Sequence, residues 1–126
     1  MVIQLHHVSL IVADTQRALD FYAGLLGLEI DTSRPDLGFP GAWLNVGDRQ
    51  IHLLELANPD PLEGRPSHGG RDRHTALIID DFVTMREKLD RAGIDYTLSR
   101  SGRQALFCRD PDQNAVELIL SPNQGV

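Results

Sequence analysis

Three histidines and one glutamate stand at positions where their side chains could bind one metal ion. His7 and His74 each open a segment rich in β-branched and apolar residues, and His52 and Glu117 lie within later segments of the same kind. Glu117 interrupts an apolar run, where an unpaired carboxylate is costly to bury, so it needs either solvent or a cation. Three imidazoles and a carboxylate suit a first-row divalent ion such as Ni, Zn, Mn, Fe or Co. The residue types therefore predict a four-ligand metal site.

An internal repeat relates these four positions in pairs. Three pairs of segments recur in the same order, with the offset drifting only from 67 to 65 residues: 7–14 with 74–81, 27–30 with 93–96, and 51–54 with 116–119. The repeat makes His7 equivalent to His74 and His52 equivalent to Glu117. If the two halves pack about a pseudo-twofold axis with their sheets facing, the four side chains meet in the middle.

Each half of the repeat is predicted to contain a strand, a helix and three further strands. In the first half we expect strands at 3–12, 28–31, 42–46 and 50–56 and a helix between Asp14 and Gly27. In the second half we expect strands at 74–79, 94–98, 104–108 and 115–120 and a helix from Asp81 to about Ala92. Asp14 is a good N-cap, and Gly27 is placed to end the first helix in a left-handed turn.

Length and composition favour one small globular domain. The 126 residues carry 12 basic and 18 acidic side chains, a net charge of −6, which gives no electrostatic basis for binding nucleic acid or an anionic membrane. A single cysteine excludes a disulfide framework within one chain. The opening residues show no secretory signal, and no apolar run approaches the roughly 18 residues of a membrane span. We expect a cytoplasmic protein with one domain (1–126): module one at 1–57, a linker at 58–73 and module two at 74–121.

The chain resembles the vicinal oxygen chelate superfamily, also called the glyoxalase and bleomycin-resistance fold. The segments that carry the resemblance are His7-Val8-Ser9-Leu10-Ile11-Val12 with Asp14, Arg17-Ala18-Leu19-Asp20-Phe21-Tyr22, Leu25-Leu26-Gly27-Leu28, Ile51-His52-Leu53, and Asp110 to Leu118, with Gln113 where glycine is common. The resemblance implies an α+β fold in which two tandem βαβββ modules form a curved eight-stranded sheet around a central cavity, with the helices outside. It also implies that the first-strand histidines and the last-strand glutamate bind a divalent ion.

The expected activity is glyoxalase-like lyase or isomerase chemistry on a small carbonyl substrate that chelates the metal through adjacent oxygens. Glu117 would serve both as a ligand and as the general base that takes a proton next to the carbonyl. Ser9, Arg34 and Arg103 are the expected substrate-binding residues. His52 stands where glyoxalase I enzymes usually have Glu or Gln. Related epimerases use two carboxylate bases, and with His52 present only one remains, which counts against a two-base epimerase.

Two other functions stay open. The triad of His7, His74 and Glu117 also resembles the iron site of extradiol dioxygenases, and bleomycin-resistance members bind a drug without a metal. Two histidines stand outside the predicted ligand set: His6 is expected on the opposite face of its strand, and His68 is expected to be solvated in the linker. Short two-module relatives often pair, so we expect a homodimer whose sites are shared between chains.

Overall fold

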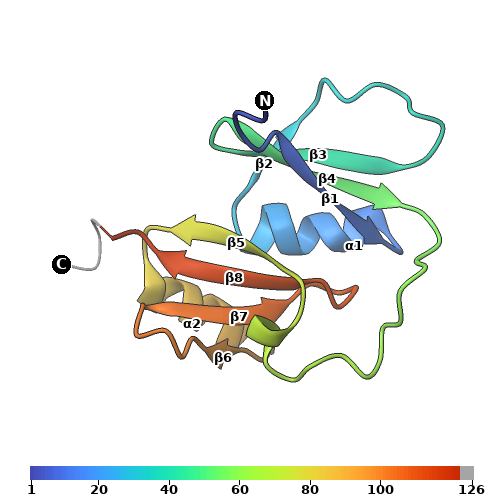
Figure 1. Ribbon diagram of the computed structural model, residues 1–126. Coiled ribbons are helices and arrows are strands. Elements are labelled where there is room, and N and C mark those ends of the chain that lie inside the picture. The colour runs from blue at the N-terminus through green and yellow to red at the C-terminus, as the bar shows by residue number, and fades with distance from the viewer. Residues whose placement is uncertain (123–126) are drawn as a thin grey trace. The chain divides into compact units, whose positions relative to one another are not determined.

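The computed structural model describes residues 1–122 and divides into two compact units, Met1–Asp60 and a second that begins at Pro61. Each unit holds one four-stranded mixed sheet (Figure 1). The first sheet has the order β1 (His7–Val12), β4 (Arg49–Glu55), β3 (Gly41–Val46) and β2 (Glu29–Asp31). The second has the order β5 (His74–Ile79), β8 (Ala115–Leu120), β7 (Ala105–Arg109) and β6 (Thr97–Leu98). In both sheets the first strand runs parallel to the last and the other neighbours are antiparallel.

The helices also follow the repeat, which confirms the predicted α+β class. The helical elements are α1 (Thr15–Leu19), a π-helix (Asp20–Leu25), a 3-10 turn (Gly69–Arg71) and α2 (Phe82–Arg91). The side chains of Asp14 and Asp81 accept hydrogen bonds from the backbone N–H three residues later, as expected of N-caps. The first helix ends before Gly27, whose φ is +81°. The π-helix was not predicted, and its wider turn is closed by the Leu26 N–H donating to the Phe21 oxygen at 2.9 Å.

Alternation along the strands gives each sheet a buried apolar face and a second face that carries the candidate ligands. In the second sheet Leu106, Val116 and Leu118 are almost fully buried, and Figure 1 shows α2 behind this sheet. In the first sheet Leu44, Ile51 and Leu53 are buried in the same way, and α1 packs on β3 and β4. The odd-numbered residues of β1 and the even-numbered residues of β5 therefore lie on the opposite faces of their sheets, together with His52 of β4 and Glu117 of β8.

Two strands are shorter than predicted, and for β1 the reason is that its partner strand ends. The register pairs His7 with Gln50, and β4 begins only at Arg49, so residues 3–5 have no strand beside them. Met1, Val2 and Ile3 are accordingly exposed. In the second unit only residues 97–98 of the expected 94–98 strand pair with β7.

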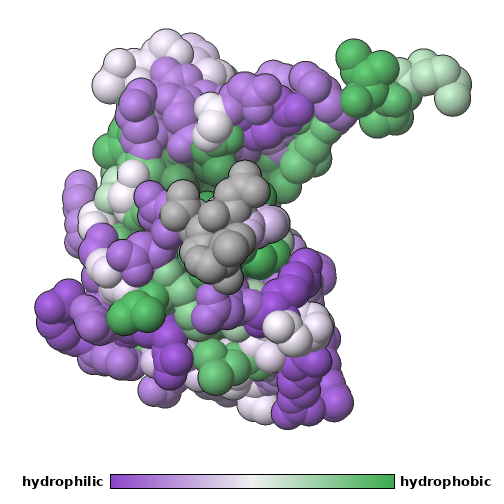
Figure 2. Space-filling model, turned by 90° about the vertical axis from the view of Figure 1, so that its left-hand side faces the viewer, coloured by the Kyte–Doolittle hydropathy of each residue, from purple (hydrophilic) through white to green (hydrophobic). Residues whose placement is uncertain are grey.

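The surface is mixed in polarity. The face drawn in Figure 2 is mainly hydrophilic, with apolar side chains scattered among the hydrophilic ones. Among residues 1–122 no helix combines the length and the apolar character that crossing a membrane requires.

Candidate metal centre

His7 of β1 and His52 of β4 form a first donor pair on the face of the first sheet opposite its buried apolar residues. Their imidazole rings are stacked, with centroids 3.9 Å apart and an interplanar angle of 20°. Trp43, the register partner of His52 on β3, also stacks on His52 at 4.5 Å and 12°. These contacts hold the His52 ring in one orientation without any ion.

The hydrogen bonds of the first donor pair determine which ring nitrogens are available. His7 Nδ1 lies 2.8 Å from His6 Nδ1, and the described residues offer no hydrogen-bond partner to His7 Nε2. His52 Nε2 is engaged with Gln50 Oε1 at 2.8 Å. Burial lowers the pKa of His52, and electrostatic interaction with the nearby His7, His6 and Arg34 side chains lowers it further. His52 is therefore neutral at pH 7, which is the form of imidazole that binds metals.

His74 of β5 and Glu117 of β8 form a second donor pair. Glu117 is only 4% exposed, and its Oε1 lies 3.3 Å from His74 Nε2. His74 Nδ1 donates to the backbone oxygen of Asp72 at 2.9 Å, because a carbonyl can only accept. His74 Nε2 therefore faces the carboxylate either as an N–H or as a lone pair that a cation must bridge. A histidine held through Nδ1 in this way is typical of a metal ligand.

The two donor pairs occupy equivalent places in their sheets. In each sheet the first-strand histidine lies two residues before the register partner of the last-strand donor. Ser9 is the partner of His52, and Ala76 is the partner of Glu117. The equivalence seen in the sequence repeat is thus also an equivalence of backbone position.

The donor set fits a divalent ion, with two donors from each unit. Neutral imidazoles and one buried carboxylate are ligands that Ni, Zn, Mn, Fe and Co accept. Within either unit, the part of the chain that the structure describes contains no group of three His, Cys, Asp or Glu side chains able to hold a metal. The structure brings together His7 with His52 and His74 with Glu117, whereas the union of the two pairs at one ion stays a prediction.

The sequence and the fold of the chain match those of known proteins. A family model described as the Glyoxalase/Bleomycin resistance protein/Dioxygenase superfamily matches residues 4–118. The chain belongs to this superfamily. It is 32% identical over 120 residues to Glyoxylase I 4 of Arabidopsis thaliana, covering 90% of this chain and 68% of the relative. It is 28% identical over 133 residues to the lactoylglutathione lyase of Escherichia coli O157:H7, covering 97% of this chain and 96% of the relative.

Solved structures of the superfamily share the fold. A glyoxalase family protein from Bacillus anthracis aligns with a TM-score of 0.77 at 20% identity, covering 96% of this chain and 97% of that one. The fosfomycin resistance protein FosX of Listeria monocytogenes, solved as a variant with Mn(II) and a dihydroxypropylphosphonic acid, aligns with a TM-score of 0.76 at 19% identity. That alignment covers 100% of this chain and 98% of the FosX chain.

The three residues predicted to contact the substrate differ in their exposure and in their hydrogen bonds. Ser9 is exposed on β1, opposite His52. Arg34 is half-buried, and its Nη2 donates to the Phe39 oxygen at 2.9 Å. Arg103 Nη2 donates to Glu117 Oε2 at 3.4 Å. Arg103 therefore contacts the second donor pair directly, which the sequence did not indicate.

The segment before β5 is fixed on the second unit, contrary to the expectation that His68 is solvated. His68 Nδ1 lies 2.6 Å from Thr97 Oγ1, and its ring meets the edge of Phe107 with centroids 4.9 Å apart. Phe107 also meets the ring of His74 at 5.1 Å and is the register partner of Glu117. His68 therefore lies on the face that carries the second donor pair. We expected a solvated His68 because the residues around it are rich in Gly and Pro, which is typical of an exposed linker.

An ion-pair cluster anchors this segment. Arg65 donates to both carboxylate oxygens of Asp72, at 2.9 and 3.1 Å, and Arg109 Nη1 donates to Asp72 Oδ2 at 2.8 Å. The hydrogen bond from Arg65 is the largest cause that holds the pKa of Asp72 well below its usual range, and Arg109 adds to it. Asp72 is thus ionised at neutral pH and ties β7 to the segment that precedes His74.

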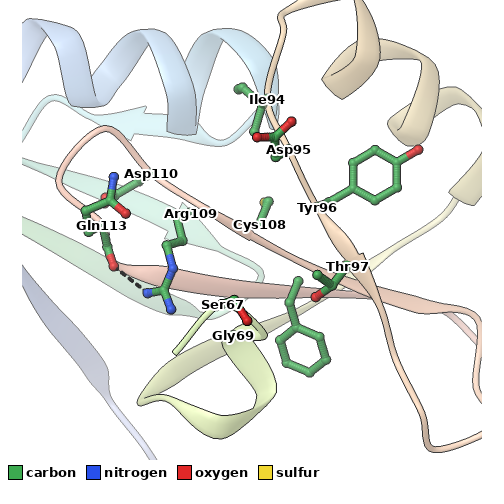
Figure 3. Close-up of a pocket in the computed structure, with 11 residues that line it drawn as sticks. Ser67, Gly69, Ile94, Asp95, Tyr96, Thr97, Cys108, Arg109, Asp110 and Gln113 are labelled. Carbon is green, nitrogen blue, oxygen red and sulfur yellow. Dashed lines mark hydrogen bonds between the residues drawn. The ribbon is translucent and has the colours of Figure 1, made fainter. Parts of the chain in front are cut away.

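A cavity of about 340 Å³ lies in the second unit (Figure 3). Its lining includes Tyr96, Thr97, Cys108, Arg109 and Gln113, and none of the predicted metal ligands. Arg109 closes one side by donating to the Gln113 backbone oxygen at 2.8 Å. Burial raises the pKa of the Cys108 thiol to about 12, so it is not a nucleophile at neutral pH.

Proposed function

We propose that the chain is a divalent-metal-dependent enzyme with glyoxalase-like lyase or isomerase activity on a small carbonyl substrate. The observation that carries the proposal is the identical register of the two donor pairs, one of two imidazoles and one of an imidazole and a carboxylate. The named relatives support it, since they include a lactoylglutathione lyase, and Mn(II) is bound in the FosX structure.

In this proposal four side chains would bind the metal, and one of them would also act as the general base. His7, His52, His74 and Glu117 would hold the ion, which supplies Lewis-acid stabilisation of negative charge on substrate oxygens. Glu117 would take the proton from the carbon next to the carbonyl and return it to the neighbouring carbon.

Substrate contacts and assembly belong to the same proposal. Ser9, Arg34 and Arg103 would bind the substrate. The two donor pairs would meet at one ion in a cytoplasmic homodimer whose sites are shared between chains. The long 57–73 connection supports sharing, because it would let a unit of one chain pair with a unit of the other.

Metal binding can be tested through the only tryptophan of the chain, Trp43, which stacks on His52. Chelator-treated full-length protein is titrated with Ni²⁺, Co²⁺, Mn²⁺, Fe²⁺ and Zn²⁺, with fluorescence and calorimetry as readouts. We expect saturable quenching by a paramagnetic ion and one ion per four-donor site. Glu117→Gln and His74→Ala should weaken binding, whereas His68→Ala, a histidine outside the donor set, should not.

Catalysis is tested with the hemithioacetal of methylglyoxal and glutathione, followed by the ultraviolet absorbance of the thioester product. Turnover should require the metal and should be lost in Glu117→Gln. Failure of every ion to bind would contradict the proposal and would favour a metal-free drug-binding protein. Metal binding without turnover of this compound would contradict the proposed reaction and leave the proposed metal site standing.

A second candidate, an extradiol-type dioxygenase, is favoured by one contact. His52 Nε2 is already engaged with Gln50 Oε1, so it binds an ion through that atom only after releasing the amide. The remaining ligands, His7, His74 and Glu117, are the two histidines and one carboxylate typical of non-haem iron oxygenases. Oxygen uptake with catechol in the Fe²⁺-loaded protein, retained in His52→Ala, would identify this function.

A further inference from the structure

A cavity of about 110 Å³ in the first unit opens beside His52. It is formed by β1, β3, β4 and the loop between β2 and β3. Its lining combines aromatic and aliphatic side chains with a single cation: Ser9, Arg34, Leu37, Phe39, Trp43 and His52, together with Leu53 and Leu54. The cavity thus joins an apolar wall, a positive charge and a candidate metal ligand within one unit.

The cation of this cavity has no acidic partner. Arg34 is half-buried, its Nη2 donates to the Phe39 backbone oxygen, and its guanidinium carbon lies 5.3 Å from the centre of the Phe39 ring. Among residues 1–122 no carboxylate pairs with Arg34, and its other N–H groups have no hydrogen-bond partner there. A partly desolvated guanidinium with free donors is suited to recognise an anion.

The position of Arg34 depends on a glycine. A Cβ atom at Gly41 would collide with the Leu53 backbone oxygen and would lie 3.1 Å from Arg34 Nη2. Gly41 therefore lets the guanidinium lie close to the backbone of β3, two residues before Trp43 and near the His52 ring. The backbone around Gly41 and the Phe39 oxygen therefore fix the position of the Arg34 guanidinium, which does not move freely as a flexible surface side chain would.

The size and charge of the cavity define its ligand. A closed protein cavity of roughly 150 Å³ encloses a benzene ring, so this smaller, open cavity takes part of a phenyl ring or a branched alkyl group against Trp43 and Phe39. Arg34 is the only Arg or Lys in the lining, and one guanidinium balances one negative charge, which suits a carboxylate better than a doubly charged phosphonate.

We propose that this cavity, the Arg34 pocket, binds the carboxylate-bearing apolar arm of the substrate, with the carboxylate on Arg34 and the apolar group against Trp43. The proposal rests on the proposed function for the role of the site, and it narrows the substrate class to small carboxylates with an aryl or branched alkyl group. The oxygens that chelate the ion would then lie on the His52 side of the arm.

The test is a binding measurement on chelator-treated full-length protein without any added metal. Phenylacetate, its neutral isostere phenylacetamide, and benzylphosphonate are titrated separately while the fluorescence of Trp43 is excited at its long-wavelength edge. A charge-assisted hydrogen bond makes phenylacetate bind about tenfold or more tightly than phenylacetamide. Arg34→Met should abolish this preference, and Arg34→Lys should keep part of it, since it keeps the charge.

Arg49→Met is the matched control, because Arg49 lies on β4 of the same unit but binds Asp48 and Gln4 outside the pocket. It should keep the full preference for the acid. Equal affinity for the acid and the amide, or an unchanged preference in Arg34→Met, would overturn the proposal. Tighter binding of benzylphosphonate than of phenylacetate would overturn the assignment to a carboxylate. Because no metal is present, these results are independent of whether the proposed metal site exists.

Discussion

Replacing Glu117 by glutamine should separate the metal-binding role of this residue from its role in stability. The carboxylate is 4% exposed, and its contacts to His74 and Arg103 measure 3.3 and 3.4 Å, longer than the 2.7–2.9 Å of a strong charge-assisted bond. The Arg103 side chain is 59% exposed, so solvent screens its charge. Without an ion, burial of the charge is therefore incompletely offset.

We expect the substitution to change the free energy of unfolding in opposite directions with and without metal. Removing the charge while keeping the shape should leave the metal-free protein equally stable or more stable, by about 1 kcal/mol. At a free metal concentration of 100 times Kd, binding stabilises the native protein by about 2.7 kcal/mol. If the amide weakens binding a hundredfold, the same concentration stabilises the variant by only about 0.4 kcal/mol.

Urea unfolding followed by Trp43 fluorescence and circular dichroism measures both effects. Glu55→Gln is the control, because Glu55 accepts a hydrogen bond from the Thr15 N–H at 2.8 Å and lies outside both donor pairs. It should keep the full metal-dependent stabilisation. The reasoning is refuted if Glu117→Gln lowers the stability of the metal-free protein by more than about 1 kcal/mol, or if metal stabilises it as much as the unmodified chain.

Three further predictions concern other parts of the chain. Gln113 adopts a φ of +68°, a conformation that costs a side-chain-bearing residue roughly 1–2 kcal/mol, so Gln113→Gly should stabilise the protein by about 0.5–1 kcal/mol in urea unfolding, while Gln104→Gly should not. Burial raises the pKa of Cys108 from 9.0 to about 12, so the folded protein should resist iodoacetamide at pH 8, with mass spectrometry as the readout. The unfolded thiol loses its proton first, so this group's contribution to stability is complete below pH 9.0 and is lost as pH rises towards 12; fast alkylation of folded protein at pH 8 would contradict the burial. Mixing His7→Ala and Glu117→Ala chains should restore some turnover if each site draws ligands from two chains, and no recovery would exclude shared sites.

Much of the fold was predictable because it depends on local patterns. The pattern of apolar and β-branched residues placed six of the eight strands within one residue of their observed bounds. The two aspartate N-caps predicted where the helices begin, since capping needs only a side chain and the next turn of backbone. Strand ends were less predictable, because the start of β1, for example, depends on how far its partner strand β4 extends.

The candidate site was predictable in part for the same reason. Parity along a strand assigns His7, His52, His74 and Glu117 to faces, and the repeat pairs them. The environments of Arg34 and His68 were not predictable, because both lie in irregular segments whose backbone has no period. Their contacts with Phe39, Thr97 and Phe107 exist only once the loops have folded onto the sheets.

The amino-acid sequence by itself determined the duplicated strand and helix order and the identity of the four metal-binding candidates, because hydrophobic periodicity and residue type are properties of short segments. Only the tertiary structure decided that His52 is neutral and stacked between neighbours, that Glu117 is buried beside His74 and Arg103, and that an unpaired arginine lines a cavity next to His52. Burial, charge and hydrogen bonding depend on which distant residues come into contact, and no short segment contains that information.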